Sequence, residues 1–295
     1  MKIIERKLQS IGESLLLSLP KPWTKLFHLK KGSVVQLLVG EQGTLTLAPT
    51  ITEHKEKKNS TIIYDQHFIR RFYHDYFEGN ETITIQFKEP PAKKAYEELQ
   101  TFLNNFMNAQ IIAEEKDKLI IKCFTINELG IEECLERMYH LSQSMLEALL
   151  QGNTEKLNDM DKTITKFYYL LVMQIRRYLS EGTYTQQTLT LLRAMDCRMA
   201  AEKIERIADN IKNVGILPKE LLQHYITFQH YYHEAFQTFI HQRYEQGMPL
   251  LQEAYTMKKT YQKLIEQQKN LTPYQQLITL QQCLTYAKEI SLFVR

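Results

Sequence analysis

The chain has 295 residues, of which 43% are apolar and 24% are charged, and its 37 basic and 34 acidic side chains leave a net charge of +3. That balance is typical of a folded protein and excludes a long disordered chain. The longest apolar run, residues 167–173, is much shorter than the about 18 residues of a membrane-spanning helix, and residues 1–20 lack the pattern of a signal peptide. We therefore predict a cytoplasmic protein with no membrane insertion.

Glycine (10) and proline (8) are scarce, whereas tyrosine (17) and methionine (10) are plentiful, which favours a mainly helical chain. The cysteines form no Cys-x-x-Cys pair. We expect them to be reduced, apolar side chains; they are Cys123, Cys134, Cys197 and Cys283.

Residues 1–50 form a small basic module. They hold seven basic and three acidic side chains, a net charge of +4, so the remaining residues sum to −1. The pattern predicts a strand over 15–19, one helical turn over 23–28, and strands over 33–39 and 44–48 joined by a turn at 40–43. A basic module beside a nearly neutral body indicates that the module is the part that meets a polyanion.

A linker and a small α/β module follow. We predict the linker at 51–60, because residues 52–60 contain no apolar side chain. In residues 61–125, candidate strands and helices alternate in short segments, as in small α/β modules. The strands are expected at 61–64, 82–87, 111–113 and 118–123, and the helices at 65–77 and 90–108.

Residues 127–295 have helical periodicity throughout, with apolar side chains three and four positions apart. Breaks predicted at 152–153, 182–183, 215–218, 247–249 and 272–273 delimit six helices. A segment that ends in glycine before a helix, residues 148–152, reappears at 242–247. This recurrence indicates a duplicated three-helix unit in a helical bundle.

The first module resembles the SpoVT/AbrB family of DNA-binding domains. The residues that carry the resemblance are Arg6-Lys7, a glycine before a strand, Ser-Leu-Pro-Lys-x-Trp at 18–23, a Lys-Lys-Gly turn at 30–32 and a final hairpin. The resemblance implies a homodimer in which two chains interleave hairpins into one barrel that binds duplex DNA. By position it implies that Arg6, Lys7 and Lys21 contact DNA, with Lys25 as a secondary contact.

One residue departs from that pattern. Many relatives have a basic or small residue after the glycine, and this chain has Glu13, whose carboxylate repels phosphate. From the residues alone, the basic side chains could instead merely solvate a small barrel.

Two segments of the helical half have a distinctive sequence. They are residues 198–213, with Glu-Arg-Ile-Ala-Asp-Asn at 205–210, and residues 161–176. Through these segments, of which the first is the stronger match, the helical half resembles the PhoU family, whose members are six-helix bundles of two three-helix repeats. The middle module resembles the connector of archaeal-type proteins that fuse the two families. The expected fold class is therefore mainly α, a PhoU-like bundle preceded by a small α/β module and a β swapped-hairpin domain.

Glu205 and Asp209 lie one helical turn apart, so both carboxylates share one helix face. With Asp161 from a neighbouring helix, they could bind a divalent or ferric ion such as Mg, Zn, Fe or Mn through hard oxygen ligands. The alternative is a solvated face on which Arg206 pairs with Glu202 and Asp209.

Two departures from the PhoU pattern limit the metal hypothesis to at most one weakened site. Thr165 stands where relatives have a second carboxylate, and Thr256 and Thr260 lie near the acidic positions expected in the second repeat. A separate cluster has imidazole and carboxylate spacing that can hold a transition metal, but an aromatic-rich, solvated helix is the preferred interpretation, because no partner residues on a third helix are visible. This cluster is Glu220, His224, His230, His233 and Glu234.

The chain contains no P-loop, Gly-x-Gly-x-x-Gly, Gly-x-Ser-x-Gly or His-Glu-x-x-His motif, and we predict that it is not an enzyme. The resemblance implies a phosphate-responsive transcriptional regulator of phosphate uptake. In the alternative, the protein is a cytoplasmic adaptor that binds a phosphate ABC transporter ATPase, a signalling protein or metal ions, and its first domain only dimerises.

Overall fold

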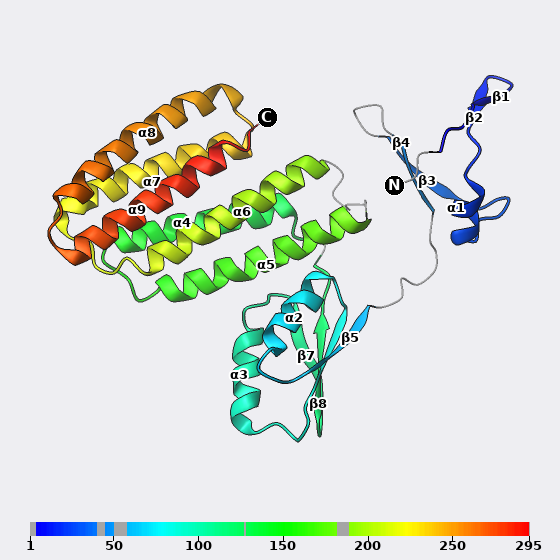
Figure 1. Ribbon diagram of the computed structural model, residues 1–295, viewed down its shortest axis with the longest axis horizontal. Coiled ribbons are helices and arrows are strands. Elements are labelled where there is room, and N and C mark those ends of the chain that lie inside the picture. Colours follow the sequence, from blue (N-terminus) through cyan, green and yellow to red (C-terminus); the bar gives the residue numbers. More distant parts are fainter. Residues whose placement is uncertain (1–3, 40–44, 50–57, 127, 182–188, 295) are drawn as a thin grey trace. The chain divides into compact units, whose positions relative to one another are not determined.

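The computed structural model describes residues 4–39, 45–49, 58–126, 128–181 and 189–294 (Figure 1). They belong to two compact units, residues 1–57 and 58–295. None of the helices in these ranges combines the length and the apolar character that spanning a bilayer requires.

The N-terminal unit consists of two hairpins and one short helix. Strands β1 (Gln9–Ile11) and β2 (Ser14–Leu16) pair antiparallel across a turn in which Gly12 has a φ of 61°. Helix α1 (Lys21–Leu26) follows Pro20, and β3 (Val35–Val39) then pairs antiparallel with β4 (Leu45–Pro49). The sequence did not predict β1, because three residues carry too little periodicity to mark a strand; the predicted turn at 40–43 lies outside the described residues.

The N-terminal unit has no core of its own among the side chains that the structure describes there, because none of them is buried. Most of its large apolar side chains are instead exposed, from 42% for Ile4 to 81% for Val39, and the other described ones are half-buried. The exposed set is Ile4, Leu8, Ile11, Leu15, Leu16, Leu17, Leu26, Val34, Leu37, Val39 and Leu45.

The α/β module contains a four-stranded sheet of order β5-β6-β8-β7. Strand β5 (Asn59–Ile63) is parallel to β6 (Thr82–Gln86), whereas β8 (Lys118–Cys123) is antiparallel to both β6 and β7 (Ala109–Glu115). Helices α2 (Phe68–Phe77) and α3 (Lys93–Leu103) meet through the rings of Phe72 and Phe102, 5.2 Å apart. Residues 51–57 of the expected linker lie outside the described residues, and its last residues, Asn59 and Ser60, begin β5.

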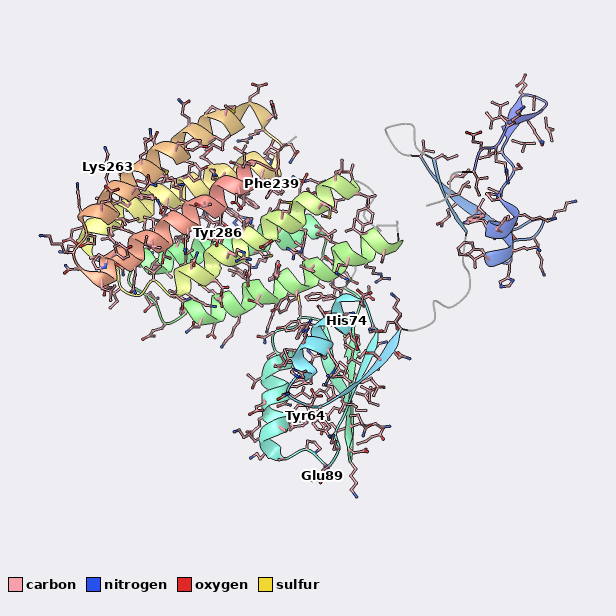
Figure 2. The ribbon with its side chains drawn as sticks, viewed as in Figure 1. Tyr64, His74, Glu89, Phe239, Lys263 and Tyr286 are labelled. Carbon is pink, nitrogen blue, oxygen red and sulfur yellow. The ribbon has the colours of Figure 1, made fainter. Side chains whose placement is uncertain are left out.

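Six helices form the bundle in the described part of the chain: α4 (Ile131–Leu150), α5 (Leu157–Glu181), α6 (Leu191–Lys212), α7 (Lys219–Ile240), α8 (Tyr244–Gln267) and α9 (Leu271–Ser291). Helices α4, α5 and α6 pack together, and α7 and α8 pack on α9. The two groups join through contacts of α6 with α9 and of α4 with α7. Phe239 is fully buried in α7, whereas Lys263 is exposed on α8 (Figure 2).

Two of the predicted helix breaks are wrong. Residues 247–249 lie inside α8, which begins at Tyr244, and residues 272–273 lie in the first turn of α9. Pro273 is tolerated because the first N–H groups of a helix have no hydrogen-bond partner within the helix. Pro249 lies further inside α8 and removes one backbone hydrogen bond of that helix. The chain turns instead at residues 241–243, where Gln242 has a φ of 51°, and at 268–270.

The prediction for the cysteines is confirmed, since all four thiols are buried and free. Burial raises the pKa of each to about 12, so each stays protonated and packs as an apolar side chain.

Candidate functional site

An acidic cluster lies between α5 and α6. Helix α6 carries Glu205 and Asp209, and Asp161 comes from the first turns of α5. Lys212 joins the two helices, because its Nζ donates hydrogen bonds to Asp161 Oδ2 at 2.7 Å and to Asp209 Oδ1 at 2.5 Å. The structure therefore brings the three predicted carboxylates together around a lysine that the sequence analysis did not single out.

The electrostatics of this cluster leave negative charge uncompensated. Asp161 is only 8% exposed, and its Oδ1 is buried without a hydrogen-bond partner among the described residues. Burial raises the pKa of Asp161 in spite of its bond to Lys212. Burial, and then the charges of Asp209 and Asp161, raise the pKa of Glu205 to about 7. The neighbouring cations Lys212, Arg206 and Lys162 oppose these two pKa shifts without cancelling them.

The solvated pairing proposed as the alternative is present in part. Arg206 Nε lies 2.9 Å from Glu202 Oε1, as the spacing predicted. Asp209 pairs with Lys212 three residues later. The only sequence signal for that partner was its spacing of three from Asp209, which places both on one helix face.

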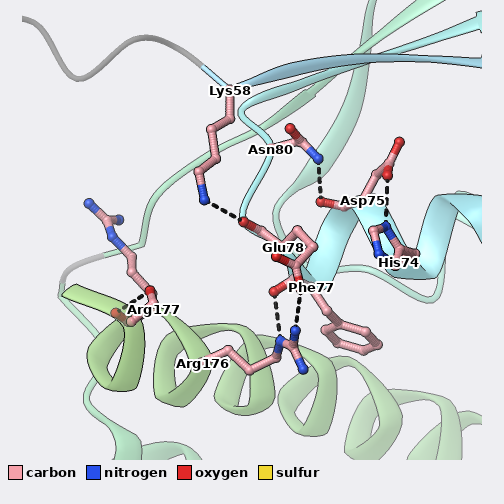
Figure 3. Close-up of polar contacts among 9 residues, drawn as sticks. Lys58, His74, Asp75, Phe77, Glu78, Asn80, Arg176 and Arg177 are labelled. Atoms are coloured by element: carbon pink, nitrogen blue, oxygen red, sulfur yellow. Dashed lines mark hydrogen bonds and ion pairs between the residues drawn. The ribbon is translucent and has the colours of Figure 1, made fainter. Parts of the chain in front are cut away.

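Helix α5 also contacts the α/β module. Arg176 Nε donates to the Phe77 carbonyl at 2.9 Å, and its guanidinium pairs with Glu78 (Figure 3). Nearer the middle of the helix, the hydroxyls of Tyr169 and Tyr73 lie 3.1 Å apart. The helix that supplies Asp161 to the cluster is therefore bound directly to the connector.

The second repeat lacks the acidic cluster that the PhoU resemblance suggested near Thr256 and Thr260. Both threonines are exposed on α8 and donate to carbonyls of their own helix, Thr256 to Gln252 at 3.1 Å and Thr260 to Thr256 at 3.2 Å. They belong to no site, because the residues of α8 that face α9 are one and two positions away.

The histidine cluster on α7 does not come together. His233 Nδ1 lies 2.6 Å from the Tyr139 hydroxyl, while His230 is exposed. Across the described residues, no group of three histidine, cysteine, aspartate or glutamate side chains has the arrangement of a metal site.

The predicted DNA contacts lie in the N-terminal unit. Arg6 and Lys7 precede β1, Lys21 begins α1 and Lys25 lies in its last turn, and all four are exposed. Arg6 Nη1 donates to the neighbouring Glu5 carbonyl at 3.2 Å. No contact among the described residues joins the four, and Glu13 is exposed in the turn between β1 and β2.

Comparison with known proteins finds one similarity, and it covers the acidic cluster. No curated protein and no solved structure matched the chain. The family model of the PhoU domain matches residues 135–216, from the first turns of α4 to the end of the loop after α6. The helices that hold the acidic cluster are therefore similar to a PhoU domain.

Proposed function

We propose that this protein is a dimeric, phosphate-responsive transcriptional regulator that controls phosphate uptake. The PhoU domain supports a role in regulating phosphate uptake. The DNA-binding part of the proposal falls on residues 1–50, and one observation carries it. Every large apolar side chain described as exposed in the N-terminal unit needs a partner surface, and a second copy supplies one.

A second copy is the partner that the unit's own geometry favours. About fifty residues cannot enclose a sufficient apolar core alone. The described order of hairpin, helix and hairpin agrees with a domain in which two chains interleave hairpins. In β3 and β4, Leu37 lies opposite Leu47 in the register, so these strands offer apolar side chains to a second hairpin.

The basic side chains of the dimer are available to a polyanion. Arg6, Lys7, Lys21 and Lys25 are exposed, and doubling a module of net charge +4 concentrates positive charge. Contacts of this kind with DNA phosphates release counterions, so affinity falls steeply with salt. Glu13 weakens this attraction near β1.

Fluorescence anisotropy of the full chain with duplex promoter DNA over a salt series tests the proposal. The double variant Arg6→Ala with Lys7→Ala should bind more weakly and lower the salt slope by about 0.9 for each lost phosphate contact. The control is Lys93→Ala with Lys94→Ala, which removes two consecutive lysines that are exposed on α3. Equal slopes for wild type and the Arg6/Lys7 variant would contradict DNA contact at these residues.

Transcript measurements test the regulatory part. Deletion of the coding sequence should abolish the normal response of phosphate-transport transcripts to phosphate starvation. Transcripts that keep their normal response would instead favour the adaptor, which binds a transporter ATPase or signalling protein and uses the first unit only to dimerise.

We also propose that Glu205, Asp209 and Asp161 bind a divalent or ferric ion weakly. As they stand, these three carboxylates lack the arrangement of a metal site, so binding requires their side chains to move. The carboxylates are hard oxygen donors, and the unpartnered Asp161 Oδ1 leaves a buried acceptor for a cation. The ion would supply charge compensation and a link between α5 and α6. It must compete with Lys212, whose ammonium already bonds Asp161 and Asp209.

Thermal unfolding with Mg²⁺, Zn²⁺, Mn²⁺ or ferric ion, compared with a chelator, tests this binding. An ion that binds only the native state raises the unfolding temperature. Glu205→Gln with Asp209→Asn should abolish the rise, and Lys212→Gln should increase it by removing the competing cation. Identical melting of the wild type with ion and with chelator would leave the cluster as an ion-pair network only.

A further inference from the structure

A small pocket lies between α8 and α9 in the second repeat. Its volume is about 60 Å³, several times the roughly 10–15 Å³ that one water molecule requires. Helices α8 and α9 pack against each other. The residues that line the pocket are Ala254, Tyr255, Lys258, Leu284, Thr285 and Lys288.

The buried positions of α5 and α8 can be matched, and the match relates this pocket to the acidic cluster. Both α5 and α8 have buried positions at the same spacing in the turns that face the last helix of their repeat. The corresponding buried residues are Leu157, Asp161 and Ile164 on α5, and Leu250, Ala254 and Met257 on α8. In this register Thr165 corresponds to Lys258.

The last helix of each repeat shows the same correspondence. The matching buried residues are Ile204, Ala208 and Ile211 on α6, and Cys283, Ala287 and Ile290 on α9. Glu205 therefore corresponds to Leu284, and Asp209 corresponds to Lys288. The pocket is therefore the second repeat's counterpart of the acidic cluster. Ala254 replaces Asp161, Leu284 replaces Glu205, and Lys288 replaces Asp209.

The two lysines give this counterpart the opposite charge. Neither Lys258 nor Lys288 has an ion pair with the described residues, and the nearby Glu289 is engaged by Lys203 at 2.8 Å. Lys288 Nζ lies 6.0 Å from the ring centre of Tyr255, which helps to hold it at the pocket. The exposed Lys258 and the half-buried Lys288, one from each helix, therefore line a pocket whose counterpart in the first repeat is acidic.

We propose that the pocket between α8 and α9 binds a small oxyanion, and that inorganic phosphate is its ligand. Phosphate is compact enough for a pocket of this size, and all its oxygens accept the charge-assisted hydrogen bonds that lysines donate. The binding stands independently of DNA recognition; only its role as the effector site rests on the proposed function.

Isothermal titration of the full chain with potassium phosphate, in the absence of DNA, tests the site. A matched titration with potassium chloride at equal ionic strength corrects for general charge screening. We expect saturable binding of one phosphate per chain. Lys288→Gln and Lys258→Gln should each weaken it by about tenfold or more, because each removes a charged donor.

The control is Lys259→Gln, which removes the same charge from the residue next to Lys258 but does not line the pocket. It should bind phosphate as the wild type does, and Lys288→Arg should retain binding because it keeps a cationic donor. Helical circular dichroism of each variant confirms that the bundle is folded.

Absence of saturable phosphate binding, or binding that both glutamine variants leave unchanged, would overturn the proposal. Cosedimentation with phosphatidic acid vesicles distinguishes a lipid headgroup as the source of the anion. Vesicle binding that depends on Lys288, with no binding of free phosphate, would also overturn it. Salt-dependent DNA binding by the N-terminal unit can survive any of these results, so this failure and that of the proposed function are distinguishable.

Discussion

The N-terminal unit and the helical bundle differ in how far they bury their apolar side chains. In the unit, Leu37 is 56% exposed and no described side chain is buried. In the bundle, Phe236 is 1% exposed and its ring stacks on Tyr139 with centres 3.8 Å apart. Long amphipathic helices enclose a core within one chain, whereas short hairpins do not. The bundle therefore buries its core within one chain, whereas the unit leaves its apolar side chains exposed, which is the basis of the proposed dimer.

The largest effect should come from placing a charge in the exposed apolar surface of the unit. Leu37→Asp should convert the dimer into a monomer, because a carboxylate cannot enter an apolar interface without a partner. Light scattering of the full chain measures the mass. The control is Ile216→Asp, which alters an equally apolar, 79% exposed side chain between α6 and α7 and should leave the dimer intact. A monomeric wild type would remove the basis of the comparison.

The next effect concerns the bundle core. Phe236→Ala should lower the free energy of unfolding of the bundle by about 3–5 kcal/mol, because it opens a cavity beside Tyr139. Denaturant unfolding followed by circular dichroism measures the loss. Tyr244→Ala, at a 68% exposed aromatic residue on α8, should change it by less than about 0.5 kcal/mol. Similar losses for both variants would mean that the bundle core is not closed in one chain.

A smaller loss of stability tests the difference between the two repeats of the bundle at the acidic cluster. Lys212→Ser should cost about 3 kcal/mol, because it leaves Asp161 largely buried without a counter-charge. Adding Asp161→Ala should recover most of the loss, since Ala254 and Ser291 occupy the corresponding positions of the second repeat. Chemical unfolding of the single and double variants completes the cycle. A double variant as unstable as Lys212→Ser would contradict the correspondence between the repeats.

The smallest effect is expected at the contact of the α/β module with α5. Arg176→Gln removes a half-exposed ion pair with Glu78 and a bond to the Phe77 carbonyl, which together contribute about 1 kcal/mol or less. Hydrogen exchange of α2 should rise in the variant. Arg70→Gln, at an exposed arginine of the same helix, is the matched control and should leave exchange unchanged.

The sequence predicted most elements of the fold, because the signals that mark them are local. Apolar residues three and four positions apart predicted the bundle helices, and alternation predicted the strand β6. It misplaced two helix boundaries because Pro249 and Pro273 are ordinarily breaks, and it missed β1 because of its length. At the acidic cluster, the pair Glu205 and Asp209 was predictable from spacing alone.

What the sequence by itself determined is therefore the set of side chains that share one face of one element, such as the two carboxylates on α6. Only the tertiary structure decided which faces meet. Lys212 reaches Asp161 from another helix, and Lys258 and Lys288 line one pocket from two helices. Helical periodicity is a property of neighbouring residues, whereas the pairing of helix faces depends on packing between segments that are far apart in the chain.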